Sequence, residues 1–328
     1  MLSTSNILLE ARDLRKHFPI TKGFISRKKV GWVKAVDGVS FSINRGETFG
    51  LVGESGCGKT TTARLILLVD QPTSGSVLFE GADVLALADT KLKQYSRSVQ
   101  AVFQDPYGSL DPRMKVGDII SEPLVVTQAL PRKEMVERVK RVLLEVGLDP
   151  ESINRFPHQF SGGQQQRIAV ARALAPEPKV IILDEPVSAL DVSIRAQLMN
   201  LLKALQERLG LTYMLIAHDL AVVKHMSNSM GVMYVGHIVE YGDADDIYQH
   251  PCHPYTVGLL SAALPADPDA PSTEIILVGE VPSPINPPRG CRFHPRCTHA
   301  KRICSDKEPD LRKVAANHFV ACHFDLGG

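Results

Sequence analysis

The sequence predicts an α/β fold with a parallel sheet covered by helices, followed by a small cysteine-bearing tail. Three observations lead to this prediction: short apolar segments alternate with amphipathic helical segments, a glycine-rich turn joins one apolar segment to a helix, and the composition changes near residue 263. Uninterrupted apolar strands are typical of parallel sheets, because both faces of such sheets are buried. With 328 residues, of which 44% are hydrophobic, the chain is long enough for one large domain and an appendage.

The N-terminal segment predicts antiparallel strands instead. Short apolar runs occur at Ile7–Leu9, Val33–Val36 and Val39–Ile43, and turn residues separate them. A loop or hairpin tip is expected at Pro19–Gly31, which contains two glycines and a run of basic residues.

Further along the chain, strands and helices alternate. The expected strands are Thr48–Val52, 76–80, Val180–Leu183 and Tyr213–Ala217. The expected helices are Thr60–Leu68, 132–147, Gln166–Leu174 and Asp191–Leu209. In the last of these helices isoleucine and leucine side chains share one face, Asp191 can cap the start, and Gly210 ends it.

After about residue 263 prolines interrupt any long element, so we expect a domain boundary there. Residues 1–263 form the main domain in this prediction, and residues 264–328 form a Pro-rich tail. The tail is too short to bury a good core of its own.

The charge balance and the hydropathy pattern limit the classes of partner. Lys and Arg number 37 against 36 Asp and Glu, a balance that gives no support for nucleic-acid binding. No apolar run approaches the roughly 18 residues that a membrane helix needs. The N-terminus has neither a basic segment nor a long apolar stretch, so we expect no signal peptide and a cytoplasmic protein. If it works at a membrane, it docks on proteins that span the bilayer.

A phosphate-binding loop is the strongest motif in the chain. The segment Gly53-Glu54-Ser55-Gly56-Cys57-Gly58-Lys59-Thr60 matches the pattern G-x-x-x-x-G-K-[ST], with a strand before it and a helix after it. The glycines let successive N–H groups face an anion, and the helix adds its positive N-terminal end. Lys59 is expected at the β- and γ-phosphates, Thr60 at Mg²⁺, and Thr61 beside them.

Polar side chains that follow apolar strands are candidates for the chemistry on ATP. Asp184 and Glu185 end the strand that starts at Val180; Asp184 would hold Mg²⁺ through water, and Glu185 would orient or deprotonate the attacking water. His218 follows the next strand and is expected to contact the γ-phosphate. Gln104 follows another apolar segment, and its amide can ligate Mg²⁺ or hold water.

A second helix start with anion-binding character occurs in the same chain. Ser161, Gly162 and Gly163 precede Gln164 and Gln165 at the start of a predicted helix. This helix start and the phosphate loop can serve one ATP only if two chains pair head to tail.

These motifs resemble the ABC ATPase family, and they occur in that family's order. The corresponding elements are the Walker A loop (Gly53–Thr60), the Q-loop (Gln104), the signature (Ser161–Gln165), the Walker B strand (Val180–Asp184) with Glu185, the D-loop (188–191, ending at Asp191) and the switch histidine (His218). The resemblance covers roughly residues 7–262. It implies a P-loop NTPase fold of the ABC nucleotide-binding type, with a RecA-like core, an antiparallel β subdomain and a helical subdomain at about 105–175.

The resemblance also implies roles for particular residues. It implies a nucleotide-sandwich dimer, in which the signature of one subunit contacts the ATP held by the Walker A loop of the other. Phe18 matches the family's adenine-stacking aromatic, and Asp191 matches its D-loop aspartate. The signature departs from the family pattern because Phe160 stands where leucine is usual.

Two further segments narrow the resemblance to the oligopeptide and dipeptide importers, and to their F-type ATPase subunit. These segments are Val33–Phe41 and His253-Pro254-Tyr255-Thr256, the latter followed by a cysteine-bearing tail. The resemblance implies a second ATPase subunit, two permease subunits, an external peptide-binding protein, and a place on the cytoplasmic face of the membrane. Alternatives are import of nickel or another small solute, an exporter, and a soluble ABC ATPase in repair or translation.

Four cysteines crowd into the tail: Cys291, Cys297, Cys304 and Cys322. In a reducing compartment such a group favours metal over disulfides, but its spacing does not choose between zinc and an iron–sulfur cluster. Four thiolates suit a [4Fe–4S] cluster, and the resemblance implies the same cofactor; Zn²⁺ and a metal-free tail are the alternatives. The expected role is to stabilise a tail that lacks its own core.

Overall fold

A computed structural model describes residues 6–22, 28–104, 106–128, 130–188, 190–263, 277 and 279–324. The chain folds into two compact units. The first unit takes its residues from 1–8, 43–47 and 82–215, and the second from 9–42, 48–81 and 216–328. Each unit is therefore built from segments that are far apart in the sequence.

The core of the first unit contains the strands β6 (Val99–Val102), β7 (Val180–Asp184) and β8 (Thr212–Ala217), the last of which continues into the second unit. Strands β6 and β7 are parallel, with Val99 opposite Val180 and Val102 opposite Leu183. Every residue of β7 and β8 is buried, which explains why both sequences are almost continuously apolar. The predicted parallel pairing is confirmed here.

Helix α6 lies at the centre of the helical part of this unit, against β6 and against α4, α5 and α7. Helix α5 starts where the sequence predicts it, and Gly147 follows it with a φ of 73°. The helices are α2 (Asp89–Ser98), α3 (Pro106–Ser109), α4 (Val116–Thr127), α5 (Arg132–Glu145), α6 (Gly162–Leu174) and α7 (Val192–Leu209). Shorter elements are β5 (Ala82–Asp83) and the 3₁₀ turns Val84–Ala86, Pro150–Asn154 and Pro157–Gln159.

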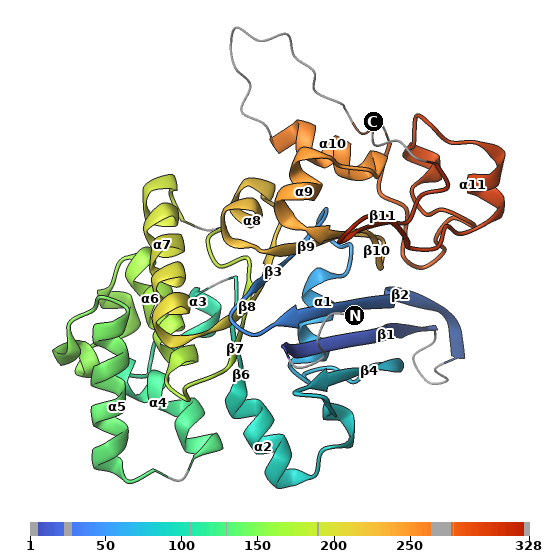
Figure 1. Cartoon of the computed structure of the whole chain (residues 1–328). Helices are drawn as coiled ribbons and strands as arrows, with labels where there is room; N and C mark the ends of the chain where they lie inside the picture. Colours follow the sequence, from blue (N-terminus) through green and yellow to red (C-terminus); the bar gives the residue numbers. More distant parts are fainter. Residues whose placement is uncertain are drawn as a thin grey trace, which may run out of the picture. The chain divides into compact units, whose positions relative to one another are not determined.

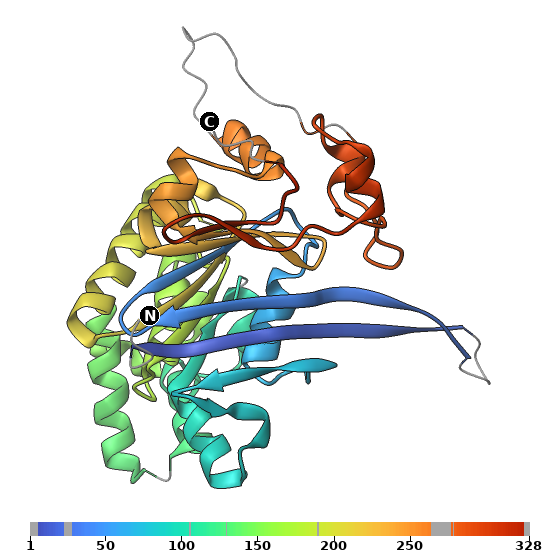
Figure 2. The same ribbon diagram turned by 45° about the vertical axis from the view of Figure 1, so that its right-hand side comes forward.

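The second unit contains two groups of strands. Strands β1 (Ile7–Lys22), β2 (Lys28–Asn44) and β4 (Ser74–Phe79) lie in the order β2-β1-β4, and the two long ones run side by side in both views (Figures 1 and 2). The other group has the order β11-β12-β10-β9-β3. In it β3 (Thr48–Val52) is parallel to β9 (Ser229–Tyr234), and β10 (His237–Asp243) is antiparallel to both β9 and β12 (His318–Val320). Strand β11 (Arg312–Ala315) pairs with β12.

The helices of the second unit are short. They are α1 (Lys59–Ile66), α8 (Leu220–Met226), α9 (Ala244–Gln249), α10 (Pro254–Ala263), α11 (Arg302–Asp306) and the 3₁₀ turn His294–Arg296. The pairing of β10 with β12 joins the tail to the core sheet of this unit, so the tail has a partner for its own small hairpin. The tail thus extends a larger sheet, which stabilises a segment that is too small to bury a core of its own.

The predicted loop at Pro19–Gly31 is wrong in its extent. Strand β1 runs to Lys22 and β2 starts at Lys28, so only residues 23–27, which lie outside the described residues, separate the strands. Pro19 is tolerated in β1 because the pairing of β1 with β4 ends at Arg15, so no β4 carbonyl requires an N–H at Pro19.

The predicted domain boundary near residue 263 falls at the end of α10. The prolines that suggested it at positions 265, 268 and 271 lie outside the described residues. Within the part of the chain that the structure describes, no helix is both long and apolar enough to span a bilayer.

Candidate nucleotide site and cysteine site

The phosphate loop connects β3 to α1 in the second unit, as the sequence predicts. Its backbone needs glycine at two positions. Gly53 and Gly58 have φ values of 151° and 115°, and a Cβ on either would lie 2.2 Å from a carbonyl oxygen, that of Met233 or of Ala35. The backbone segments at Met233 and Ala35 approach the loop so closely that only glycine fits at these two positions, and this fixes the path of the loop.

Lys59 is the first residue of α1 and is 5% exposed. Its Nζ donates to the carbonyl oxygens of Gly53 at 2.6 Å and Glu54 at 3.0 Å. The ammonium group is thus held over the loop, where phosphates are expected. Cys57 packs inside the loop, and burial raises the pKa of its thiol, so it acts as a small apolar side chain.

Two other predicted ATP contacts belong to the second unit. Phe18 lies on β1, half-buried, with the Nζ of Lys16 4.9 Å from the centre of its ring. His218 follows β8 and is exposed, and Asp219 behind it caps α8 through the N–H groups of Ala221 and Val222. Their roles toward ATP stay predictions.

The two candidate catalytic residues of the first unit, Gln104 and Glu185, lie together. The Nε2 of Gln104 donates to Oε2 of Glu185 at 3.0 Å, and Asp184, directly before Glu185, is 5% exposed. Glu185 has a φ of 47°, in the left-handed region, and its carbonyl accepts from Ser188. A non-glycine residue in this backbone conformation is uncommon outside functional sites and turns.

The signature segment caps a helix with its own side chains. Ser161 accepts from the N–H of Gln164 at 3.4 Å, and Gln164 Oε1 accepts from the N–H of Ser161 at 3.0 Å. Helix α6 therefore begins at Gly162, four residues earlier than the sequence predicts, because this capping box provides a start that the apolar spacing does not show. Gly163 is in the first turn.

The D-loop aspartate also caps a helix. Asp191 Oδ1 accepts from the N–H of Ile194 at 2.9 Å and from Ser193 Oγ at 2.8 Å, and these bonds lower its pKa. Ala189, within the same motif, lies outside the described residues.

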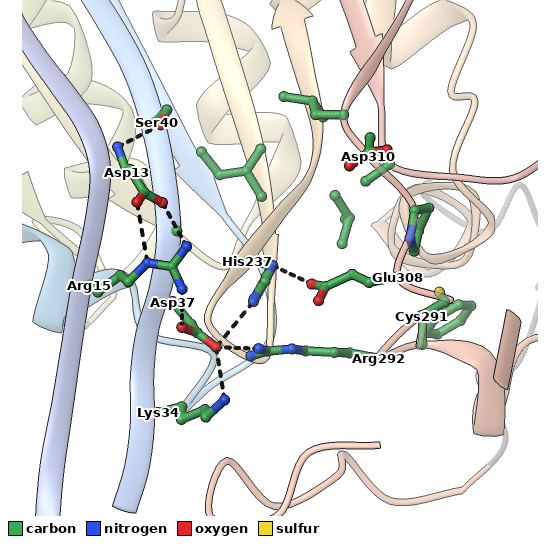
Figure 3. A pocket seen from close by; sticks show the side chains of 17 residues that line it. Asp13, Arg15, Lys34, Asp37, Ser40, His237, Cys291, Arg292, Glu308 and Asp310 are labelled. Atoms are coloured by element: carbon green, nitrogen blue, oxygen red, sulfur yellow. Dashed lines mark hydrogen bonds and ion pairs between the residues drawn. The ribbon is translucent and has the colours of Figure 1, made fainter. Parts of the chain in front are cut away.

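A pocket of about 610 Å³ in the second unit has charged walls of both signs (Figure 3). Asp37 is the shared partner: it accepts from Arg15 at 3.1 Å, lies 2.9 Å from Nε2 of His17, and accepts from Arg292 of the tail. Burial alone would raise the pKa of Asp37, but the neighbouring His237, Arg292 and His17 lower it well below its ordinary range. Positive and negative side chains in the pocket wall therefore pair with one another, and these pairs join the tail to β1 and β2.

The four tail cysteines line one small cavity. Its other lining residues are His253, Pro254, Phe293, His294, His299, His323 and Phe324. Burial raises the pKa of Cys291 to about 11 and also raises the pKa values of Cys297 and Cys322. Binding of a metal at these thiols would therefore release protons.

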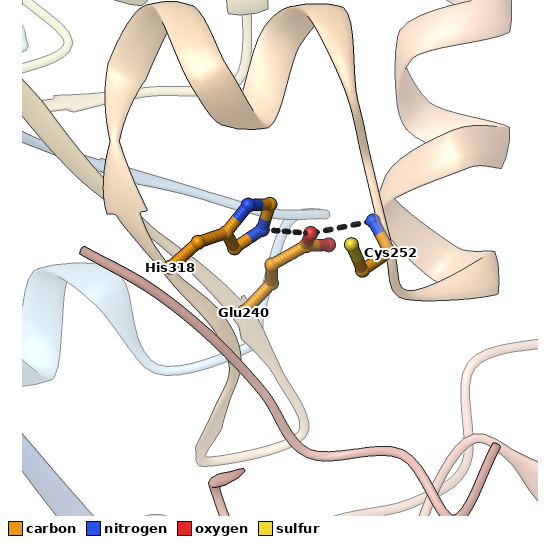
Figure 4. A group of neighbouring side chains, drawn as sticks. All are labelled: Glu240, Cys252 and His318. Atoms are coloured by element: carbon orange, nitrogen blue, oxygen red, sulfur yellow. Dashed lines mark hydrogen bonds and ion pairs between the residues drawn. The ribbon is translucent and has the colours of Figure 1, made fainter. Parts of the chain in front are cut away.

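Glu240, Cys252 and His318 form a second group of possible metal ligands (Figure 4). Oε1 of Glu240 accepts from the N–H of Cys252 at 2.6 Å and lies 2.7 Å from Nε2 of His318, while Nδ1 of His318 lies 2.9 Å from Oδ2 of Asp246. Both ring nitrogens therefore face carboxylates, which fits a protonated imidazolium. This arrangement is a buried ion pair between β10 and β12 and does not leave a ring nitrogen for a metal.

This ion pair makes stability depend on pH. The hydrogen bond with Glu240 raises the pKa of His318 above its ordinary value near 6.5, so its contribution is complete below that value and is lost as pH rises through the folded-state pKa. We expect His318→Gln to lower the free energy of unfolding by about 3 kcal/mol at pH 6 and by less at pH 9. Urea unfolding of both proteins across this range measures the difference.

His250→Gln is the matched control, because His250 faces the same acid, Asp246, at 3.4 Å but its side chain is 70% exposed. Its effect should stay near zero at both pH values. An effect of His318→Gln that does not change with pH would show that the imidazole is not charged in the folded protein.

Two family models match separate parts of the chain. The model of the ABC transporter family matches residues 36–188, and the model of the oligopeptide/dipeptide transporter C-terminal region matches residues 239–304. Among solved structures, a dimeric ATP-binding cassette described as bound to ADP and Pi has a TM-score of 0.62 at 29% identity, over 72% of this chain and 99% of that one.

Relatives of known name match almost the whole chain. The oligopeptide transport ATP-binding protein AppF of Bacillus subtilis is 51% identical over 320 residues, which is 96% of this chain and 97% of that protein. The dipeptide transport ATP-binding protein DppF of Escherichia coli is 48% identical over 96% of this chain and 93% of its own length. With its phosphate loop, its Gln104–Glu185 pair and its cysteine-lined tail, the chain belongs to the ATP-binding subunits of the oligopeptide and dipeptide ABC transporters.

Proposed function

We propose that this chain binds and hydrolyses ATP to power the import of dipeptides or oligopeptides through an ABC transporter. One observation carries the proposal: identity of about half extends over both the ATPase motifs and the cysteine-bearing tail of proteins named for peptide transport. An ABC ATPase of another class would not need the tail.

The ATP site follows from the motifs in each unit. The backbone of residues 53–58 cradles the phosphates, Lys59 neutralises them, and Thr60 and Thr61 lie in the first turn of the helix whose positive end faces them. Thr60, Gln104 and Asp184 hold Mg²⁺, directly or through water. Phe18 stacks on adenine, and Ser161, Gly162, Gly163, Gln164 and Asp191 contact the nucleotide of a paired subunit.

Hydrolysis depends on Glu185 as the group that orients or deprotonates water, with His218 at the γ-phosphate. The hydrogen bond from Gln104 supports this role, because it holds the Glu185 carboxylate in one orientation. Gln104 can thus ligate Mg²⁺ through its amide and also orient the catalytic carboxylate of Glu185.

Three kinds of partner follow from this function. A second ATPase subunit completes the nucleotide sandwich, two permease subunits span the membrane, and an external binding protein delivers the peptide. The chain itself then lies at the cytoplasmic face of the membrane.

The proposal is tested by purifying the chain from membranes with its permease and measuring uptake of a labelled dipeptide and a labelled tetrapeptide. We expect the chain to copurify with membranes, and deletion of its gene to abolish uptake of at least one peptide. Normal uptake of both peptides, together with loss of nickel uptake, would replace peptide by metal as the substrate. Recovery of the chain without any membrane protein would contradict a transport function.

We also propose that Cys291, Cys297, Cys304 and Cys322 hold a [4Fe–4S] cluster that stabilises the tail. The four cysteines line one small cavity, and four thiolate ligands suit such a cluster.

Anaerobic purification should give a brown protein with about four irons per chain. Cys304→Ser should lose most of this iron, since Cys304 is buried in the cavity wall. Cys252→Ser is the control: Cys252 is not among the residues that line the cavity, so this change should leave the iron content unchanged. A colourless protein with one zinc and no iron would refute the cluster.

A further inference from the structure

Glu54, the second residue of the phosphate loop, is held by a side chain from the cysteine tail. Two N–H groups of Arg296 donate to its carboxylate, Nη1 to Oε2 at 2.8 Å and Nη2 to Oε1 at 3.1 Å. The Arg296 side chain is 5% exposed, so this two-point ion pair is largely shielded from water. The partners are 242 residues apart in the sequence, and both belong to the second unit.

The backbone of Glu54 is fixed as well. Its N–H donates to the hydroxyl of Tyr255 at 2.8 Å, and its carbonyl accepts from Lys59. Tyr255, at the start of α10, is fully buried, and its ring lies 4.6 Å from that of Tyr234 and 5.5 Å from that of Phe293. Glu54 is therefore held at three points: its backbone N–H, its backbone carbonyl and its side-chain carboxylate.

The restraining residues alternate with the cysteines of the tail. Phe293 and Arg292 follow Cys291, and Arg296 precedes Cys297. Arg292 donates to Asp37 on β2 and, at 2.6 Å, to the carbonyl of Val235 in the turn after β9. Arg292 thus joins the cysteine-bearing segment to β2, and Arg296 joins the same segment to the phosphate loop.

We propose that Arg296 is a positioning residue for ATP binding: by holding Glu54, the tail keeps the phosphate loop in its binding conformation and so sets its affinity for ATP. The proposal rests on the nucleotide role proposed for the loop. A loop whose amides already point at the phosphate site does not lose ordering entropy when ATP binds. Without Arg296, only a fraction of molecules has the binding conformation, and the apparent affinity falls by that fraction.

The test measures ATP Kd by equilibrium binding, and KM and kcat by ATPase assay, in the complex with its permease. We expect Arg296→Ala to raise Kd and KM for ATP roughly 3- to 30-fold while kcat at saturating ATP stays near that of the wild type. Arg296→Lys should restore part of the affinity, because it returns one donor of the two. Combining Arg296→Ala with Glu54→Ala should add little to the effect of either change.

Arg12→Ala is the matched control. Arg12 also makes a two-point ion pair, with Glu10 at 2.8 Å for both bonds, but its side chain is 60% exposed and, among the described residues, it makes no hydrogen bond to the loop. It should leave Kd, KM and kcat unchanged. If Arg296→Ala does not fold, Tyr255→Phe removes only the hydroxyl that accepts from Glu54, and a rise in KM is still expected.

The outcomes separate the inference from the function. If Arg296→Ala and Tyr255→Phe fold, lose stability or kcat, but keep the wild-type KM and Kd, Arg296 is merely structural and the inference is wrong. If the wild-type protein itself does not bind ATP, the proposed function fails and the inference fails with it. A rise in KM for Arg296→Ala that Arg12→Ala does not share supports the positioning role.

Discussion

Glu185→Gln should reduce ATP hydrolysis at least ~10²-fold, the low end expected when a general base is removed, while ATP still binds. Glutamine keeps the size of the side chain and can still accept from Gln104, so the geometry of the pair is preserved. Only the negative charge that polarises water is lost. Steady-state ATPase activity and ATP Kd in the purified complex measure the two effects separately.

Glu177→Gln supplies the control for this substitution. Glu177 also has a left-handed φ, 59° against 47° for Glu185, but it pairs with Arg138 and Arg141 on the surface of the same unit. The same chemical change there should leave hydrolysis unaffected. Near-normal turnover of Glu185→Gln would remove Glu185 from the catalytic role.

Local signals in the sequence predict the strands and helices that carry the motifs. Strand β3 has the predicted ends, and β7 and β8 each differ by one residue, because a buried parallel strand must be apolar along its whole length. The sequence predicts helix α7 equally well, with Asp191 as its cap and Gly210 in the left-handed conformation at its end. The motif residues follow these elements directly, so their positions on the elements follow too.

Elements that depend on pairing with distant partners are less predictable. The length of β1 and β2 comes from their pairing with each other, whereas the composition of residues 19–31 mixes turn-forming and basic residues with scattered apolar ones. The early start of α6 depends on the reciprocal bonds of Ser161 and Gln164, a pattern that apolar periodicity does not register. In both cases hydrogen bonding outweighs propensity.

The tail shows the same limit for the functional site. Its four cysteines predict a metal site, but only the fold shows that they line one cavity. Arg296 and Tyr255 carry no motif that points to the phosphate loop, since each lies more than 200 residues from Glu54. The one available signal is indirect: an arginine beside a cysteine of the proposed metal site is a candidate partner for an acidic residue elsewhere.

Lys59→Met should weaken ATP binding about 10²-fold, because hydrogen bonds from a charged donor to charged phosphates contribute roughly 1.5–3 kcal/mol each. Methionine keeps most of the buried stem of the side chain, so the loss reports on the ammonium group rather than on packing. In the structure that group donates to the carbonyls of Gly53 and Glu54, and we expect it to turn to the phosphates when ATP binds. Lys140→Met is the control, since Lys140 pairs with Glu151 on the surface of the first unit and its loss should leave the affinity unchanged. Equilibrium binding of ATP to both variants checks the prediction, and an unchanged Kd for Lys59→Met would mean that the phosphates bind somewhere other than this loop.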